Sequence, residues 1–218
     1  THQAELVNRL LSSTSGALLL LRSVDDHTLP QPVISLTIDQ AIAHNDVTIR
    51  DLFERFLPAE KRIKRLGSVV RSEQILALSG DSAKGRRVFF ENAGVSCKNC
   101  HRIQKDGKEV GPELTTIGKK LTRVQLLESM LEPSKLIDPK YVTYVAELDD
   151  GRLLTGLLVT KDENEVVLKD AQDKLIRITS KQIEQLVPQR QSLMPDLLLR
   201  DMTAQQVADL LEYLSSLK

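Results

Sequence analysis

Two cysteines and a histidine occur together in the segment Cys97-Lys98-Asn99-Cys100-His101, and their types and spacing predict a specific chemistry. Two thiols separated by two residues can add to the two vinyl groups of one haem, and the histidine that follows can ligate the iron. The chain has only these two cysteines, so one attachment reaction accounts for both and leaves none for a disulfide. The motif therefore predicts one covalently attached haem c.

Two other uses of a Cys-x-x-Cys pair fit the sequence less well. A zinc site needs about four ligands, and the remaining histidines, His2, His27 and His44, all lie far upstream. A thioredoxin-like dithiol follows a strand in a βαβ unit, whereas the residues before Cys97 have a helical pattern. Haem attachment is the favoured interpretation.

His101 is the expected proximal ligand of the iron because of its place in the motif. Its other ring nitrogen should donate to a backbone carbonyl, which fixes the tautomer and strengthens the ligand. The candidate acceptor is Pro112, whose rigid ring keeps the Gly111-Pro112 loop in one shape.

A thioether sulfur is a good sixth ligand, and the chain has three methionines. Met130 falls on an apolar helix face and is expected in the core. Met202 precedes the cap of the last helix and is expected to pack against its first turn. Met194 is held in an extended conformation by Pro195, which presents its side chain from a loop. Met194 is therefore the predicted sixth ligand.

Composition limits the class of protein. The chain has 218 residues, enough for one large domain or two small ones, and 41% of them are hydrophobic. Aromatic residues make up only 3% and Trp is absent, so a haem would supply a large apolar body that the protein lacks. The formal net charge is zero, which argues against bulk binding to nucleic acid or to an anionic membrane.

The sequence has no recognisable secretory signal at its start, because the apolar run 17–21 is too short for a signal core or a membrane span. Covalent haem attachment nevertheless implies export, since the ligation machinery works outside the cytoplasmic membrane. We therefore expect a periplasmic or otherwise exported location. We also expect that the chain, which opens on Thr1, is a piece of a longer protein.

The pattern of apolar residues predicts a mainly α protein with two parts. Residues 1–68 are expected to form short helices joined by Pro-bearing turns, in the manner of a HEAT-like repeat or of an irregular helical linker. Residues 69–218 are expected to form the haem domain, with a helix capped by Asp81 and a last helix opened by a Thr203–Gln206 capping box. Gly85 and Tyr213 should lie where these two helices cross.

The residues between the helical stretches have a different period. From Tyr141 the side chains alternate between apolar and polar, and Asp150-Gly151 is a hairpin turn signal. The stretch 141–186 is therefore predicted to be an antiparallel meander of about four strands inserted in the helical domain. Its last part, Lys181 to Leu186, is expected to be a short helical turn.

The order of these motifs resembles a class I cytochrome c domain. More narrowly, it resembles the haem-binding domain at the C-terminus of large exported planctomycete and verrucomicrobial proteins. The resemblance covers about 80–217 and rests on Gly85, Phe89, Cys97-x-x-Cys100-His101, Gly111-Pro112-x-Leu114, Pro133-Ser134, Ile137, Tyr141, Asp150-Gly151, Gly156, Ser192-Leu193-Met194-Pro195 and Tyr213. It implies thioether bonds at Cys97 and Cys100 and axial ligation by His101 and Met194.

The resulting hypothesis is a monohaem c-type cytochrome domain that transfers single electrons and is not itself an enzyme. The resemblance implies a fused or partner dehydrogenase as the electron donor. The alternative is a haem-based sensor or peroxidase-like enzyme with an exchangeable sixth ligand. In a third interpretation the meander is a binding module and the haem is a structural staple. The meander departs from a minimal cytochrome c, so its role does not follow from the resemblance.

Overall fold

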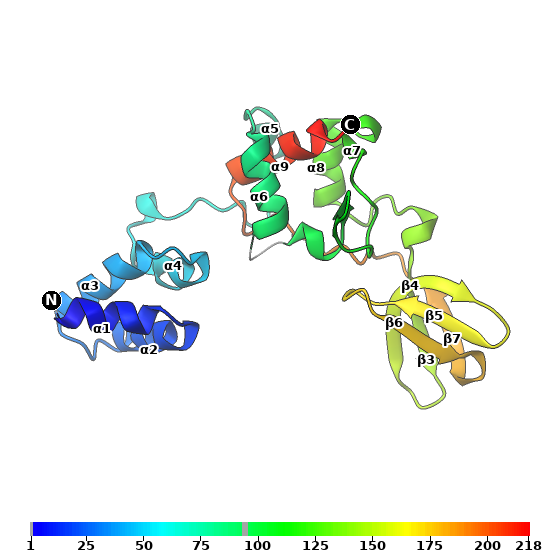
Figure 1. Cartoon of the computed structure of the whole chain (residues 1–218), viewed down its shortest axis with the longest axis horizontal. Helices are drawn as coiled ribbons and strands as arrows, with labels where there is room; N and C mark the ends of the chain where they lie inside the picture. The colour runs from blue at the N-terminus through cyan, green and yellow to red at the C-terminus, as the bar shows by residue number, and fades with distance from the viewer. Residues whose placement is uncertain (1, 93–95) are drawn as a thin grey trace. The chain divides into compact units, whose positions relative to one another are not determined.

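The computed structural model describes residues 2–92 and 96–218 and divides into two compact units, Thr1–Lys64 and Arg65–Lys218 (Figure 1). The boundary predicted from the sequence, after residue 68, falls in the same non-helical stretch that follows the first unit. No helix in the described ranges is long and apolar enough to cross a membrane.

The first unit is helical. It contains α1 (His2–Leu11), α2 (Thr14–Asp25), α3 (Gln31–Ile42) and α4 (Val47–Phe53), followed by the 3-10 turns η1 (Glu54–Phe56) and η2 (Ala59–Lys61). The hydroxyl of Ser13 accepts from Gly16 N–H and so starts α2, and the Asp46 carboxylate accepts from Thr48 N–H at the start of α4. The helices share a core of Val7, Leu11, Ala17, Leu20, Val24, Ile34, Ala41, Ile49 and Phe53. The HEAT-like assignment of these helices stays a prediction.

The helical part of the second unit carries the Cys-x-x-Cys-His motif. It consists of α5 (Ser72–Leu76), α6 (Ser82–Glu91), η3 (Cys97–Asn99), α7 (Ile117–Lys120), α8 (Arg123–Leu131) and α9 (Ala204–Ser216). The Asp81 carboxylate caps α6, and capping boxes open α8 at Thr122 and α9 at Thr203. α6 ends at Glu91. The sequence pattern predicts that this helix ends near Gly94, a residue that lies outside the described ranges.

Helices α6 and α9 cross at Gly85. A Cβ atom added to Gly85 would lie 1.9 Å from the carbonyl oxygen of Asp209 and 2.8 Å from Cβ of Tyr213. The rings of Phe89 and Tyr213 meet edge to face nearby, with centroids 6.2 Å apart. The predicted crossing near Gly85 and Tyr213 is confirmed, because only a residue without a side chain allows this approach.

The predicted meander is an antiparallel sheet. Its strands are β3 (Thr143–Leu148), β4 (Leu153–Lys161), β5 (Glu165–Lys169), β6 (Leu175–Thr179) and β7 (Ile183–Pro188), in the order β6-β5-β4-β3-β7 (Figure 1). The predicted helical turn at Lys181 to Leu186 is wrong. A 3-10 turn, η5, covers only Ser180–Gln182, and the chain then pairs with β3 as a fifth strand. This pairing satisfies the backbone hydrogen-bonding groups on the second edge of β3. The local sequence pattern does not show that this edge needs a partner strand.

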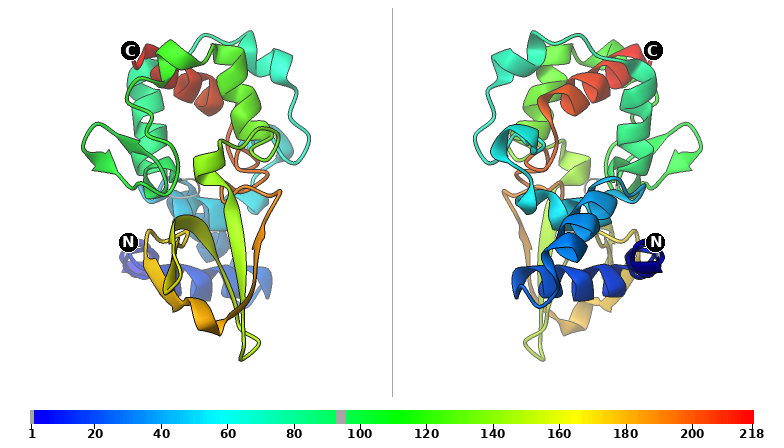
Figure 2. Two further views of the ribbon diagram at one scale, coloured as in Figure 1. Left: turned by 90° about the vertical axis from the view of Figure 1, so that its right-hand side faces the viewer. Right: turned by 90° about the vertical axis from the view of Figure 1, so that its left-hand side faces the viewer.

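Two short elements that the sequence did not predict follow the motif. β1 (Arg102–Ile103) and β2 (Asp106–Gly107) form a small hairpin, which projects at one side of the helices (Figure 2). Helix α7 is a single short turn at Ile117–Lys120. Elements of two to four residues are too short to produce a measurable apolar period.

Candidate haem-binding site

The backbone of the motif is tightly folded. The N–H groups of Cys100 and His101 both donate to the carbonyl of Cys97, at 3.1 and 2.8 Å, so the two cysteines and the histidine are held in one turn. The chain then folds back on this turn, because Val110 N–H and Gly111 N–H both donate to the carbonyl of Cys100, at 3.0 and 2.7 Å. The loop that contains Pro112 is therefore attached directly to the motif.

His101 is oriented by this returning loop. Its Nδ1 lies 2.8 Å from the carbonyl oxygen of Pro112, and because that oxygen can only accept, Nδ1 carries the proton. Nε2 is then left with a free lone pair, as a metal ligand requires. Burial lowers the pKa of His101, which favours the neutral ring, while the Pro112 carbonyl opposes the shift. The ring packs on Gly111, where an added Cβ would lie 2.5 Å from Cε1 of His101.

The two cysteines are free thiols in partly buried surroundings. Burial against the helical core raises the pKa of Cys97 to about 11. Burial also raises the pKa of Cys100, although the Lys108 ammonium opposes this. A thioredoxin-like dithiol needs a lowered thiol pKa. A zinc site needs about four ligands, and no group of three or more His, Cys, Asp or Glu among the described residues could hold a metal.

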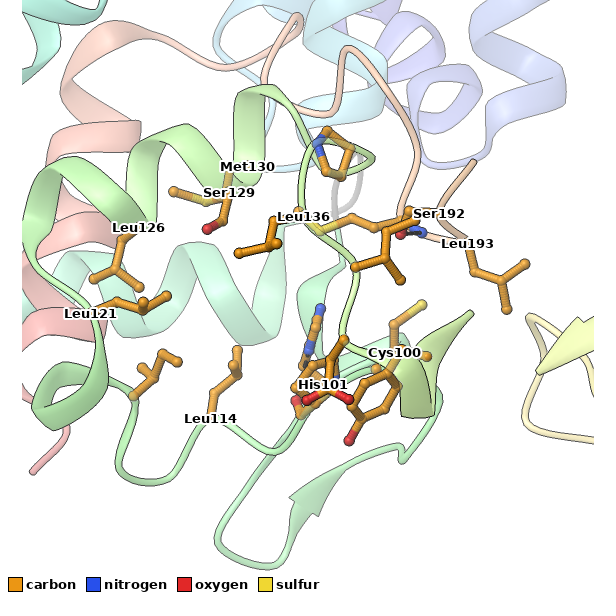
Figure 3. Close-up of a pocket in the computed structure, with 18 of the residues that line it drawn as sticks. Cys100, His101, Leu114, Leu121, Leu126, Ser129, Met130, Leu136, Ser192 and Leu193 are labelled. Atoms are coloured by element: carbon orange, nitrogen blue, oxygen red, sulfur yellow. Dashed lines mark hydrogen bonds between the residues drawn. The ribbon is translucent and has the colours of Figure 1, made fainter. Parts of the chain in front are cut away.

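A cavity of about 650 Å³ opens beside the motif. This volume is within the range of ligand and cofactor pockets, which are mostly apolar with a few polar groups. Its wall includes Cys100, His101, Val110, Gly111, Pro112, Leu114, Ile117, Leu121, Leu126, Met130, Leu136, Ile137, Tyr141, Leu157, Met194 and Leu214. Figure 3 shows His101 and Cys100 on one side, with Leu136, Ser129 and Met130 across the cavity from them. An apolar cavity with one neutral imidazole and a thiol in its wall fits a haem.

The three methionines occupy different places. Met194 lines the cavity, and its N–H donates to the Ser192 hydroxyl at 3.1 Å. Ser192 N–H in turn donates to the Ser134 hydroxyl at 3.1 Å, so the loop that presents Met194 is tied to the chain after α8. Met202 is only 1% exposed and packs in the helical core away from the cavity wall. The ligation of iron by Met194 stays a prediction.

Met130 lies in the core, as the apolar face of α8 predicts, but it also has a place in the cavity wall. The periodicity of α8 shows which face is apolar and not that part of this face borders a cavity. Met130 is therefore a second thioether within the site, which the sequence assigned only to packing.

The inserted sheet also contributes residues that the sequence did not indicate. Leu157 of β4 and Ala171, in the turn between β5 and β6, both line the cavity. Leu157 belongs to an alternating strand pattern that has no feature of its own, and Ala171 lies in a polar turn. Nothing in the sequence around either residue indicates that it lines a cavity.

Comparison with known proteins agrees with this chemistry. No family model matches the chain. Over 77 residues, however, the chain is 30% identical to a cytochrome c-553-like protein from Synechocystis sp., and the match covers 35% of this chain and 69% of that relative. Because more than two thirds of the relative is covered at this identity, the chain belongs to the same family of c-type cytochromes.

Proposed function

We propose that this chain holds one haem c, bound covalently through Cys97 and Cys100 with His101 and Met194 as axial ligands, and that it transfers single electrons. The observation that carries the proposal is the hydrogen bond from His101 Nδ1 to the Pro112 carbonyl. It leaves Nε2 free as a ligand in the wall of an apolar cavity, next to the thiol of Cys100. The family relationship to a cytochrome c-553-like protein supports the same function.

The bound haem would supply the one-electron chemistry, as its iron alternates between the ferrous and ferric states. The residues of this chain do the rest. His101 would ligate the iron, and the Pro112 carbonyl fixes the orientation of its ring. Leu114, Leu126 and the other apolar side chains of the wall keep water out. A His and Met axial pair raises the reduction potential relative to two nitrogen ligands.

Finer parts of the function follow from the sequence resemblance alone. We infer that the chain is a haem-binding domain of the type found in large exported planctomycete and verrucomicrobial proteins. It would act in the periplasm or outside the cell, and would accept electrons from a fused or partner dehydrogenase. In this role it is an electron-transfer domain and performs no catalysis of its own.

Covalent attachment is tested by producing the chain together with a haem-ligation system and extracting it with acidified acetone. The haem should remain on the polypeptide, and the ferrous pyridine adduct should have the absorption of a haem with both vinyl groups saturated. In Cys97→Ser the adduct should shift to that of a haem with one thioether bond. Haem released into the solvent from the unaltered protein would refute the proposal.

The electron-transfer role is tested against the sensor and peroxidase alternatives by adding carbon monoxide to the ferrous protein. A six-coordinate iron with a stable methionine bond should show no spectral change within minutes. Rapid formation of a CO adduct in the unaltered protein would show an exchangeable sixth ligand and would favour the sensor or peroxidase function.

A further inference from the structure

The turn between β5 and β6 is fastened to the loop that follows the Cys-x-x-Cys-His motif. The ammonium of Lys108, in that loop, donates to the carbonyl oxygen of Gln172 at 3.0 Å. In the opposite direction, the ammonium of Lys169, at the end of β5, donates to the carbonyl oxygen of Glu109 at 3.0 Å. Lys169 also forms an ion pair with Asp173 at 3.2 Å. We call these two reciprocal lysine contacts the latch.

The segments at both ends of the latch are themselves held by hydrogen bonds. On the sheet side, the Asp170 carboxylate accepts from the N–H groups of Gln172 and Lys174, at 2.9 and 2.8 Å, which holds the turn in one shape. On the motif side, Lys108 N–H donates to the carbonyl of Lys98 at 2.9 Å. A lysine contact between two such segments therefore restrains the distance between the segments.

The latch lies beside the cavity. Ala171, within the latched turn, and Leu157, on the neighbouring strand, both line it. Cys100 lines the same cavity, and the loop that the latch holds is bonded to it, since Val110 N–H and Gly111 N–H donate to the Cys100 carbonyl. The turn therefore closes the cavity on the side of Cys100.

We propose that the inserted sheet is a wall of the haem site and that Lys108 and Lys169 are positioning residues that hold it closed on the Cys100 side. This inference rests on the proposed haem function. Ferric haem carries one more positive charge than ferrous haem, and a charge is disfavoured where water is excluded. By keeping water from this edge, the latched turn favours the ferrous state and raises the reduction potential.

The test compares two double variants of the haem-loaded chain. Lys108→Met with Lys169→Met removes the latch. Lys105→Met with Lys174→Met is the control, because it removes the same two charges from the same two segments. The Lys105 and Lys174 side chains make no hydrogen bond or ion pair with other described residues. The two variants therefore change the net charge equally, and the hydrogen-exchange comparison below reports the loss of the latch contacts themselves.

At a fixed applied potential, the ratio of ferrous to ferric protein should be about threefold or more lower in the latch variant than in the control. A tenfold change in this ratio equals about 59 mV. Amide hydrogen exchange should also be faster at 170–174 and 107–111 in the latch variant than in the control. Equal potentials in the two variants would overturn the proposal, even if exchange differed, because the turn would then not shield the haem. Equal exchange would overturn it as well.

A second pair of variants serves if the latch variant fails to incorporate haem. Ala171→Asp places a carboxylate in the cavity wall, whereas Gln172→Asp places it one residue further along the same turn, outside the wall. The potential should change more in Ala171→Asp, and equal changes would contradict the proposal. If the unaltered chain binds no haem, the proposed function fails. If it binds haem but its potential does not depend on the latch, only the present inference fails.

Discussion

Gly111 lies against the ring of His101, and a Cβ added to Gly111 would lie 2.5 Å from Cε1 of that ring. The same ring is held at Nδ1 by the carbonyl of Pro112. The space between the imidazole and the backbone at position 111 is therefore too small for a methyl group, so only glycine fits there.

We expect Gly111→Ala to displace the imidazole, weaken its bond to iron and destabilise the protein by about 1–3 kcal/mol through overpacking. The absorption spectrum of the ferrous protein and its thermal unfolding measure the two effects. Gly151→Asn is the control, since a Cβ there has no neighbour within 4 Å and asparagine tolerates a positive φ. An unaltered spectrum in Gly111→Ala would show that the ring has room to move.

The three methionines give two different expected results. Met194→Ala should lower the reduction potential and abolish the weak charge-transfer band of ferric iron bound to methionine, because the thioether is lost. Met202→Ala should leave both unchanged but destabilise the fold by about 2–5 kcal/mol, since Met202 is buried in the core.

Met130→Ala decides between the two methionines of the cavity. It should destabilise the fold in the same way as Met202→Ala, because Met130 is also a core residue, but it should leave the charge-transfer band intact. Loss of that band in Met130→Ala and its retention in Met194→Ala would move the sixth ligand to α8.

Gly85→Ala should separate α6 from α9, because its new methyl group would meet the Asp209 carbonyl at 1.9 Å. We expect a loss of about 1–3 kcal/mol, which lowers the melting temperature by several degrees. Arg87→Ala on the exposed face of the same helix should have little effect. Equal melting temperatures of Gly85→Ala and Arg87→Ala would show that the helices do not meet there.

Asp209 is a buried carboxylate at the same crossing, where it accepts from Asp81 N–H at 2.9 Å and from the Gln205 amide at 2.8 Å. Asp209→Ala removes the charged acceptor of the Asp81 N–H and of the Gln205 amide, which costs about 1–3 kcal/mol. Asp209→Asn keeps an acceptor oxygen and should retain most of the stability in urea unfolding. Similar losses in both variants would mean that the charge, and not the hydrogen bond, is needed.

The sequence by itself determined the local relationships of the site. Cys97, Cys100 and His101 are within five residues, so their spacing predicts haem chemistry without any knowledge of the fold. The bond from His101 to Pro112 could be predicted for a similar reason, since a short loop must return to the motif. Gly85 and the alternating pattern after Tyr141 likewise predicted a close helix crossing and a sheet, both of which the structure confirms.

Only the tertiary structure decided which distant residues form the cavity. It brought Leu157 and Ala171 of the sheet into the wall, and it placed Met130 there as well as Met194. It also paired β7 with β3 where the sequence predicted a helical turn. These outcomes depend on contacts between segments some 35 to 90 residues apart, and the packing of whole elements, not the local period of side chains, sets such contacts.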